Sequence, residues 1–127
     1  MTNALNNPIA TIPNQPSAFS DSTLYAELWV SLASLLRSYT AAHGLNRKQQ
    51  ATVELGEDDI VVRAGDHWLK LNRHQAEIIW SREDGTRGLM RFTIEGKLQI
   101  QVGDEALHEL EEEMDMQAEA WARELMQ

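Results

Sequence analysis

The sequence of 127 residues contains no cysteine, which excludes a disulfide framework, a thiolate metal site and a thiol nucleophile. It also lacks a run of about 18 apolar residues and a basic N-terminal region followed by an apolar stretch, the patterns of a membrane span and a signal peptide. We therefore expect a soluble cytoplasmic protein that does not insert into a membrane.

Motifs typical of catalysis are missing as well. The seven glycines occur singly, so no glycine-rich phosphate loop is present, and no Gly-x-Ser-x-Gly elbow surrounds a serine. The four histidines fall in separate segments without the spacing of a metal motif. The sequence indicates a protein that is not an enzyme.

Basic residues are scarce, at 11 against 20 acidic ones, and the formal net charge is −9. This balance argues against a general nucleic-acid binder, which usually has a surplus of lysine and arginine. The acidity is unevenly spread, because residues 104–127 contain nine acidic residues and only Arg123 as a base. The rest of the chain is nearly neutral, so two electrostatically different faces are expected.

The composition and length favour one folded domain preceded by an arm. Apolar residues make up 43% of the chain, enough for a packed core. All three prolines fall in the first sixteen residues, among Asn, Thr, Gln and Ser. We interpret residues 1–20 as a disordered N-terminal arm and residues 21–127 as a single α+β domain.

Periodicity predicts a helix at each end of this domain. Apolar residues spaced three and four apart indicate a helix over about 22–43 and a second from Asp104 to the chain end. Few charged residues lie on the first helix. The second helix has a narrow apolar stripe, which comprises Leu107, Leu110, Met114, Ala118, Trp121 and Leu125.

Between the helices the period changes to two, and turn residues recur every eight to ten positions. This predicts strands at about 51–55, 60–63, 67–72, 76–82, 88–94 and 97–102. The connections are too short for crossover helices, so the sheet should be antiparallel. The predicted fold is two helices packed on one face of an antiparallel sheet of five to six strands, with the other face open.

The turn after the first strand carries clustered carboxylates. Oxygen ligands of this kind bind hard cations, so one hypothesis is a metal site at this turn. We expect no cofactor, and the alternative is that this site binds iron. Its ligands would be Glu54, Glu57, Asp58 and Asp59. The competing interpretation is a solvated acidic turn.

The open sheet face is the other candidate site. If Met90 and Phe92 point to the helices, Arg91 points outward, and that face could also hold Trp68 with Lys70 and Trp80 with Arg82. An aromatic side chain beside cations suits a protein contact. The register is not fixed by the sequence, so these tryptophans could instead belong to the core.

Two stretches carry a resemblance to the frataxin-like fold family. Leu71-Asn72-Arg73 followed by Ile78-Ile79-Trp80 resembles the frataxin sheet pattern, and Leu107-His108-Glu109-Leu110 is similar to the start of the last frataxin helix. The resemblance implies that Trp80 faces protein partners in iron–sulfur cluster assembly. It implies that Asn72 and Arg73 flank the same surface.

Residues 24–39 also look like the first helix of a frataxin-like accessory subunit of bacterial respiratory complex I. From these features we expect a non-enzymatic protein-interaction module, either an accessory subunit or an adaptor of a larger assembly. One alternative is an iron-binding protein in iron–sulfur cluster assembly. Another is an acidic secretion-chaperone-like homodimer, favoured only by the charge-poor first helix.

Overall fold

The fold consists of one helix, six strands and a second helix. The computed structural model describes residues 22–45, 47, 50–102 and 111–127, so the predicted arm at residues 1–20 lies outside the described residues. The elements are α1 (Ser22–His43), β1 (Thr52–Leu55), β2 (Asp59–Ala64), β3 (His67–His74), β4 (Glu77–Arg82), β5 (Arg87–Phe92), β6 (Leu98–Val102) and α2 (Met114–Leu125).

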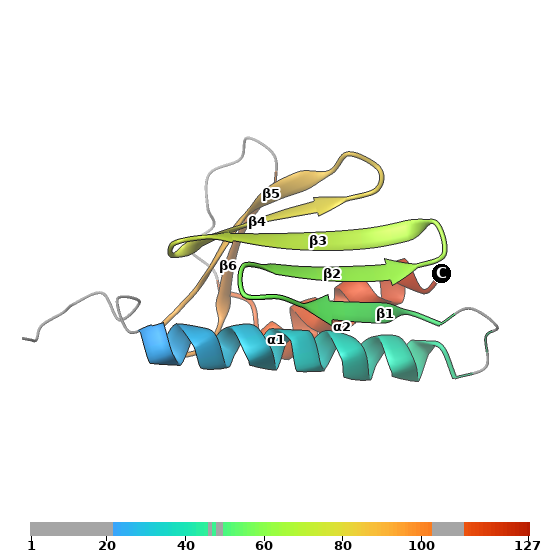
Figure 1. The fold of residues 1–127 in the computed structure, drawn as a ribbon, viewed down its shortest axis with the longest axis horizontal. Helices are drawn as coiled ribbons and strands as arrows, with labels where there is room; N and C mark the ends of the chain where they lie inside the picture. Colours follow the sequence, from blue (N-terminus) through green and yellow to red (C-terminus); the bar gives the residue numbers. More distant parts are fainter. Residues whose placement is uncertain (1–21, 46, 48–49, 103–110) are drawn as a thin grey trace, which may run out of the picture.

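The six strands form one antiparallel meander in the order β1-β2-β3-β4-β5-β6, each paired with its neighbour in the sequence. Short turns make this topology, and Gly65 between β2 and β3 has a φ of 62°, a conformation that suits glycine. The sheet twists strongly, so that β6 runs steeply across the direction of β2 (Figure 1).

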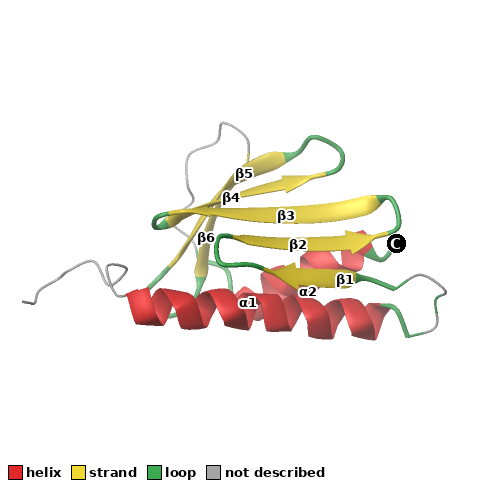
Figure 2. Cartoon of the chain, in the orientation of Figure 1, coloured by secondary structure: helices red, strands yellow, loops and turns green. Residues whose placement is uncertain are grey.

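Both helices cover the same face of the sheet and lie beside each other, which confirms the predicted α+β architecture (Figure 2). The Trp29 indole Nε1–H donates to the carbonyl of Gly56 at 3.1 Å, which ties α1 to the β1–β2 turn. His43 Nε2 lies 2.8 Å from Glu119 Oε2, which connects α1 to α2. Neither of these two described helices is long and apolar enough to cross a membrane.

The core lies between the helices and the covered sheet face. Alternate strand residues point into it because successive side chains of a strand face opposite sides. The fully buried side chains include Ile60, Val62, Leu69, Leu71, Ile78, Met90 and Leu98 from the sheet and Leu32, Leu36 and Leu125 from the helices. Met90 and Phe92 are buried toward the helices, so the condition for an outward Arg91 is met, and Arg91 is exposed.

The second helix begins later than the sequence predicts, at Met114 rather than near Asp104. Within the described residues before it, Glu112 pairs with Leu98 through two backbone hydrogen bonds of 2.8 Å. The N–H and C=O of Glu112 are therefore hydrogen-bonded to the edge of β6 and not to other residues of a helix. This tertiary pairing overrides the local helix propensity. Leu107 and Leu110 lie outside the described residues, whereas Met114, Ala118, Trp121 and Leu125 are buried as expected.

Candidate functional site

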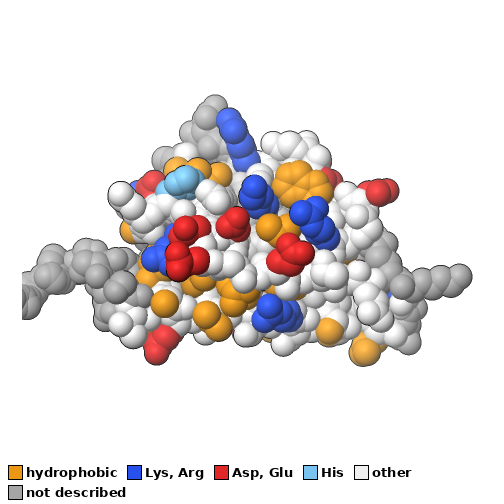
Figure 3. Space-filling view, in the orientation of Figure 1, with side chains coloured by type: hydrophobic (Ala, Val, Ile, Leu, Met, Phe, Trp, Pro, Cys, Tyr) orange, Lys and Arg blue, Asp and Glu red, His pale blue; other side chains and the backbone are white. Residues whose placement is uncertain are grey.

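The sheet face opposite the helices is a continuous surface of side chains from β1 to β6. Its residues align in rows across the strands, such as Glu54, Val61, Lys70, Ser81 and Arg87, or Asp59, Asn72, Ile79, Leu89 and Gln101. The view from this side shows side chains of both charges together with exposed apolar atoms (Figure 3). Ile79 is 39% exposed at its centre.

One end of this face gathers cations around a tryptophan. Arg63 on β2 is the direct cross-strand partner of Trp68 on β3, and Lys70 lies two residues further along the same face. Lys70 pairs with Ser81, which in turn pairs with Arg87 on β5. We call Arg63, Trp68, Lys70 and Arg87 the basic–aromatic patch; Trp68 is half-buried and the three cations are exposed.

The cations of the patch differ from other charged side chains of this face in their surroundings. Among the described residues, no carboxylate lies within ion-pair distance of Arg63, Lys70 or Arg87. Elsewhere on this face Arg91 is engaged, because its Nη2 donates to Glu77 Oε2 at 2.7 Å. The patch thus differs from its surroundings in holding positive charge that the described fold does not neutralise.

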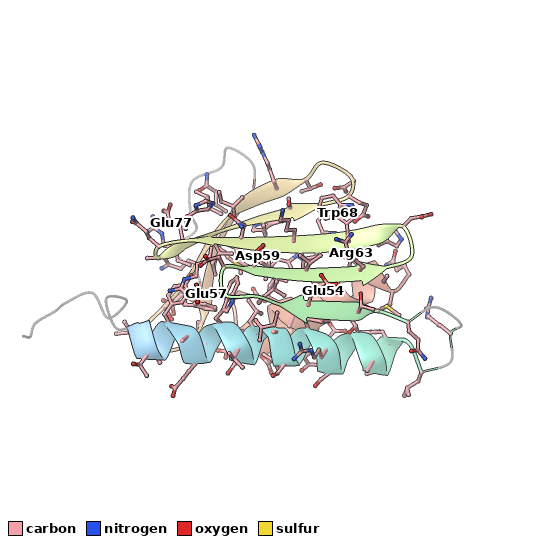
Figure 4. All side chains as sticks on the ribbon, viewed as in Figure 1. Glu54, Glu57, Asp59, Arg63, Trp68 and Glu77 are labelled. Carbon is pink, nitrogen blue, oxygen red and sulfur yellow. The ribbon has the colours of Figure 1, made fainter. Side chains whose placement is uncertain are left out.

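Three acidic side chains of this face lie away from the patch, whereas Glu54 on β1 lies in the same cross-strand row as Lys70 and Arg87 (Figure 4). Glu57, Asp59 and Glu77 gather toward the opposite end of the sheet from Arg63 and Trp68 (Figure 4). The open face is therefore polarised along the strands, although the chain as a whole is acidic. At the Trp68 end of this face three cations therefore lie with one carboxylate, that of Glu54.

The backbone at Trp68 is held from both sides by one ion pair. Arg82 Nε donates to the Trp68 carbonyl at 3.0 Å, and the Trp68 N–H donates to Glu83 Oε1 at 3.0 Å. Arg82 also contacts Glu83 at 3.2 Å and Glu124 of α2 at 2.7 Å. The position of Trp68 is consequently coupled to the helix layer beneath the sheet.

Glu83 is strongly biased toward its ionised form. Burial acts to raise its pKa, but hydrogen bonds from His67, the Trp68 N–H and Arg82 together outweigh burial. The pKa of Glu83 falls from 4.5 to about 2. This carboxylate stays charged near neutral pH and keeps its hold on the Trp68 backbone.

Trp80 and Arg82 lie on the helix-covered face, so the expectation that they meet partners on the open face is wrong. Since Ile78 faces the core, the period of two places Trp80 and Arg82 there as well. Trp80 is 5% exposed, with its ring centroid 6.1 Å from that of Trp121, and Arg82 is 9% exposed. Of the two placements that the sequence left open for Trp80, the core placement is the observed one.

The close packing opposite Trp80 explains why a glycine occupies the middle of β5. Gly88 is the cross-strand partner of Trp80, and a Cβ on it would lie 2.9 Å from the indole Nε1 and 1.9 Å from the Gln101 carbonyl oxygen. Only a residue without a side chain leaves room for the indole here. Among the described residues, no acceptor takes a hydrogen bond from the buried Trp80 N–H.

The two residues expected to flank Trp80 point to different faces. Asn72 is half-buried on the open face, between its cross-strand partners Asp59 and Ile79. The Arg73 guanidinium lies 4.2 Å from the centroid of the Tyr25 ring of α1, on the covered side of the sheet. Burial raises the pKa of Tyr25 to about 12 although the Arg73 charge acts to lower it. Asn72 and Arg73 therefore lie on opposite faces of the sheet and do not share the single surface that the resemblance implies.

The four carboxylates of the metal hypothesis do not form a ligand set. Glu54 belongs to β1, Glu57 and Asp58 to the following turn, and Asp59 to β2, and the three labelled in Figure 4 are spread along these elements. No group of three or more His, Asp or Glu side chains in the described part of the chain is arranged to hold a metal ion. The geometry favours the solvated acidic turn.

Sequence reasoning identified Trp68 and Lys70 but missed Arg63 and Arg87 as members of the patch. The missing information was the pairing between strands, because Arg63 comes next to Trp68 only through the β2–β3 register. The Gly65-Asp66 turn was the available signal, since a two-residue hairpin places the residues that flank it opposite each other.

No protein-family model, no curated protein and no solved structure matches this chain. The likeness to the frataxin-like family consequently stays a prediction.

Proposed function

We propose that this protein is a non-enzymatic interaction module that docks an acidic surface of another protein on the basic–aromatic patch. The observation that carries the proposal is the set of three exposed cations around Trp68 for which the described residues offer no ion-pair partner. Tryptophan and arginine are the residues most enriched in binding hot spots, which supports this assignment.

The partner we infer carries acidic side chains around an apolar residue. The carboxylates would meet Arg63, Lys70 and Arg87, and the apolar residue would pack on the exposed part of Trp68 and reach toward Ile79. The net charge of −9 argues against a nucleic acid, because a polymer that is negative along its whole length would be repelled by the acidic remainder of the chain.

In this proposal the module acts as an accessory subunit or adaptor of a larger assembly in the cytoplasm, with a frataxin-like arrangement of helices and sheet. The two helices serve as the support that keeps the docking face rigid. No catalytic role is assigned.

The test is affinity capture from the source cell followed by measurements on the purified partner. The wild type is compared with an Arg63→Glu/Lys70→Glu variant, which reverses two charges of the patch. The matched control is Arg91→Glu, which reverses a charge on the same sheet face outside the patch. Captured proteins are identified by mass spectrometry, and the dissociation constant of each purified partner is measured at two salt concentrations.

Support requires a purified protein with an acidic docking surface whose affinity falls at least about tenfold in the double variant but not in Arg91→Glu. Its affinity should also fall as salt rises. Equal binding by the wild type and the double variant would overturn the proposal. Capture that disappears after nuclease treatment would overturn it too, by pointing to a nucleic acid.

A further inference from the structure

The solvent-facing side of α1 carries very little charge. Only Glu27 and Arg37 supply acidic or basic side chains before His43 at the last position of the helix, whereas the exposed face of a helix usually has many. Arg37 Nη2 makes a long hydrogen bond of 3.4 Å to the Val53 carbonyl, and no described residue forms an ion pair with Glu27 or Arg37. Val30, between them, is 50% exposed.

Eight of the exposed residues of α1 form four pairs, and the two members of each pair lie at equal distances from the level of Leu32. Glu27 and Arg37 each lie five positions from it, about 7.5 Å along the axis in opposite directions. Val30 and Ser34 each lie two positions away. The same relation holds for Ala26 with Ser38 and for Thr23 with Ala41, and all eight side chains are exposed.

A second copy of α1, turned antiparallel about a twofold axis at this level, would complement the first. Glu27 of each copy would come level with Arg37 of the other, so that two opposite-charge pairs form. Val30 would lie against Ser34 of the second copy, and the small side chains would let the helices approach closely. A parallel arrangement would instead bring like charges level with each other.

We propose that this face of α1 is the contact of a twofold-symmetric homodimer in which the α1 helices pack antiparallel. The neighbouring helix supplies a second reason for this choice. The segment 111–125 around and including α2 carries six acidic residues and one basic residue, so a dimer centred on α2 would bring negative charge together. Over α1 the surface in Figure 3 is mostly apolar and uncharged polar.

The size of this face sets the strength of the association. α1 has 22 residues and is about 33 Å long, so a strip about 10 Å wide provides about 330 Å² per copy. A standard stable interface buries about 800 Å² per partner. We therefore expect a weak, concentration-dependent dimer with a dissociation constant on the order of 100 µM.

This inference goes beyond the proposed function but affects how it would operate. The basic–aromatic patch lies on the sheet face opposite the helices, so dimerisation through α1 leaves both patches uncovered. A dimer would present two copies of the patch, and a partner with two acidic segments would gain affinity through multivalency.

The test is sedimentation equilibrium from about 10 µM to about 1 mM, with charge reversals at both positions. Glu27→Arg and Arg37→Glu each place like charges across the contact, and each should weaken dimerisation at least about tenfold. The double variant Glu27→Arg/Arg37→Glu has the wild-type net charge and recreates both pairs in the opposite sense, so it should dimerise like the wild type. A wild type that stays monomeric overturns the proposal, and so does a double variant that dimerises no better than the single ones.

A second pair of variants tests the apolar part of the contact. Val30→Asp should abolish the dimer, whereas Ile79→Asp, an equivalent change on the open sheet face, should leave it intact. Since the chain has no cysteine, Ser34→Cys with a short bis-maleimide reagent gives a third readout without background. Crosslinking by Ser34→Cys but not by Thr86→Cys in the β4–β5 turn supports the antiparallel contact, and equal crosslinking of both contradicts it.

Discussion

The two faces of the sheet hold one tryptophan each on neighbouring strands, and these side chains have opposite surroundings. Trp80 on β4 is 5% exposed, packs beside Trp121 and stands over a glycine. Trp68 on β3 is half-buried with Arg63 directly across from it, and it shares the open face with Lys70 and Arg87; none of the three cations has a described ion pair. The same residue type thus serves the core on one side and, in our proposal, recognition on the other.

Arg82 joins the two environments through its ion pairs with Glu83 and Glu124. Arg82 points into the covered side and reaches Glu124 of α2, yet its Nε holds the carbonyl of Trp68. Glu83 accepts the N–H of the same residue. The helix layer can therefore fix the backbone of the open face without contacting its side chains.

The largest expected contrast between the faces is in stability. Trp80→Ala leaves a large cavity between the sheet and α2, and we expect it to lower the free energy of unfolding by about 3–5 kcal/mol. Trp68→Ala should cost about 1 kcal/mol, because much of that ring already contacts water. Urea denaturation measures both values. Similar losses of unfolding free energy for the two variants would contradict the placement of Trp80 in the core and of Trp68 outside it.

The next effect concerns the glycine beneath the buried indole. Gly88→Ala places a Cβ 1.9 Å from the Gln101 carbonyl oxygen, so β5 and β6 must shift, and we expect a loss of about 2–3 kcal/mol. Gly56→Ala is the matched control, since its nearest contact would be an ordinary 3.4 Å. Thermal unfolding of both variants tests the prediction. Equal midpoints for Gly88→Ala and the wild type would show that the sheet accommodates a side chain opposite Trp80.

A smaller effect, with a distinct pH dependence, is expected at Glu83. Its pKa is lower in the folded protein than its ordinary 4.5, so ionisation stabilises the fold. This stabilisation is complete above pH 4.5 and disappears as the pH falls toward about 2. Glu83→Gln should therefore lower stability by about 1–2 kcal/mol near neutral pH, allowing for partial exposure, and the difference should shrink as the pH falls from 4.5 toward about 2.

Urea denaturation of the wild type and Glu83→Gln from pH 7 to pH 2.5 measures this difference. Asp84→Asn at the neighbouring exposed position is the control, and it should show a smaller difference at neutral pH. A gap between the wild type and Glu83→Gln that does not change with pH would contradict the assigned role of the Glu83 charge.

The smallest stability effect is expected in the patch itself. Arg63→Glu and Lys70→Glu change exposed side chains without described ion pairs, so the free energy of unfolding should stay within about 0.5 kcal/mol of the wild type. Thermal and urea unfolding measure it. A larger loss would mean that these cations support the fold rather than a partner contact.

The architecture could be predicted from the sequence because its signals are local. The first helix was predicted over about 22–43 and observed at Ser22–His43, and all six strands lie within two residues of their predicted ends. Alternation placed Met90 and Phe92 on one face together and Arg91 on the other, and the structure shows that the first face is the buried one. The start of α2 could not be predicted, because it depends on the pairing of Glu112 with the edge of β6, which is close only in space.

The candidate site was predictable only in part, because its members come together through the strand register. Trp68 with Lys70 follows from alternation within β3, but Arg63 and Arg87 join through β2 and β5. Trp80 illustrates the opposite case. The clue to its burial was the glycine across from it, and only the pairing of β4 with β5 reveals that Gly88 is that residue.

The central claim, that the open face binds acidic segments at Trp68 while the covered face is core, can be tested on the four indole N–H signals in a nuclear magnetic resonance titration. The probe is a synthetic peptide of alternating glutamate and leucine, with a peptide of alternating glutamine and leucine as control. We predict that the glutamate peptide shifts the Trp68 signal alone, that added salt reduces the shift, and that Arg63→Glu/Lys70→Glu removes it. An unshifted Trp68 signal, or an equal shift with the glutamine peptide, would contradict the claim.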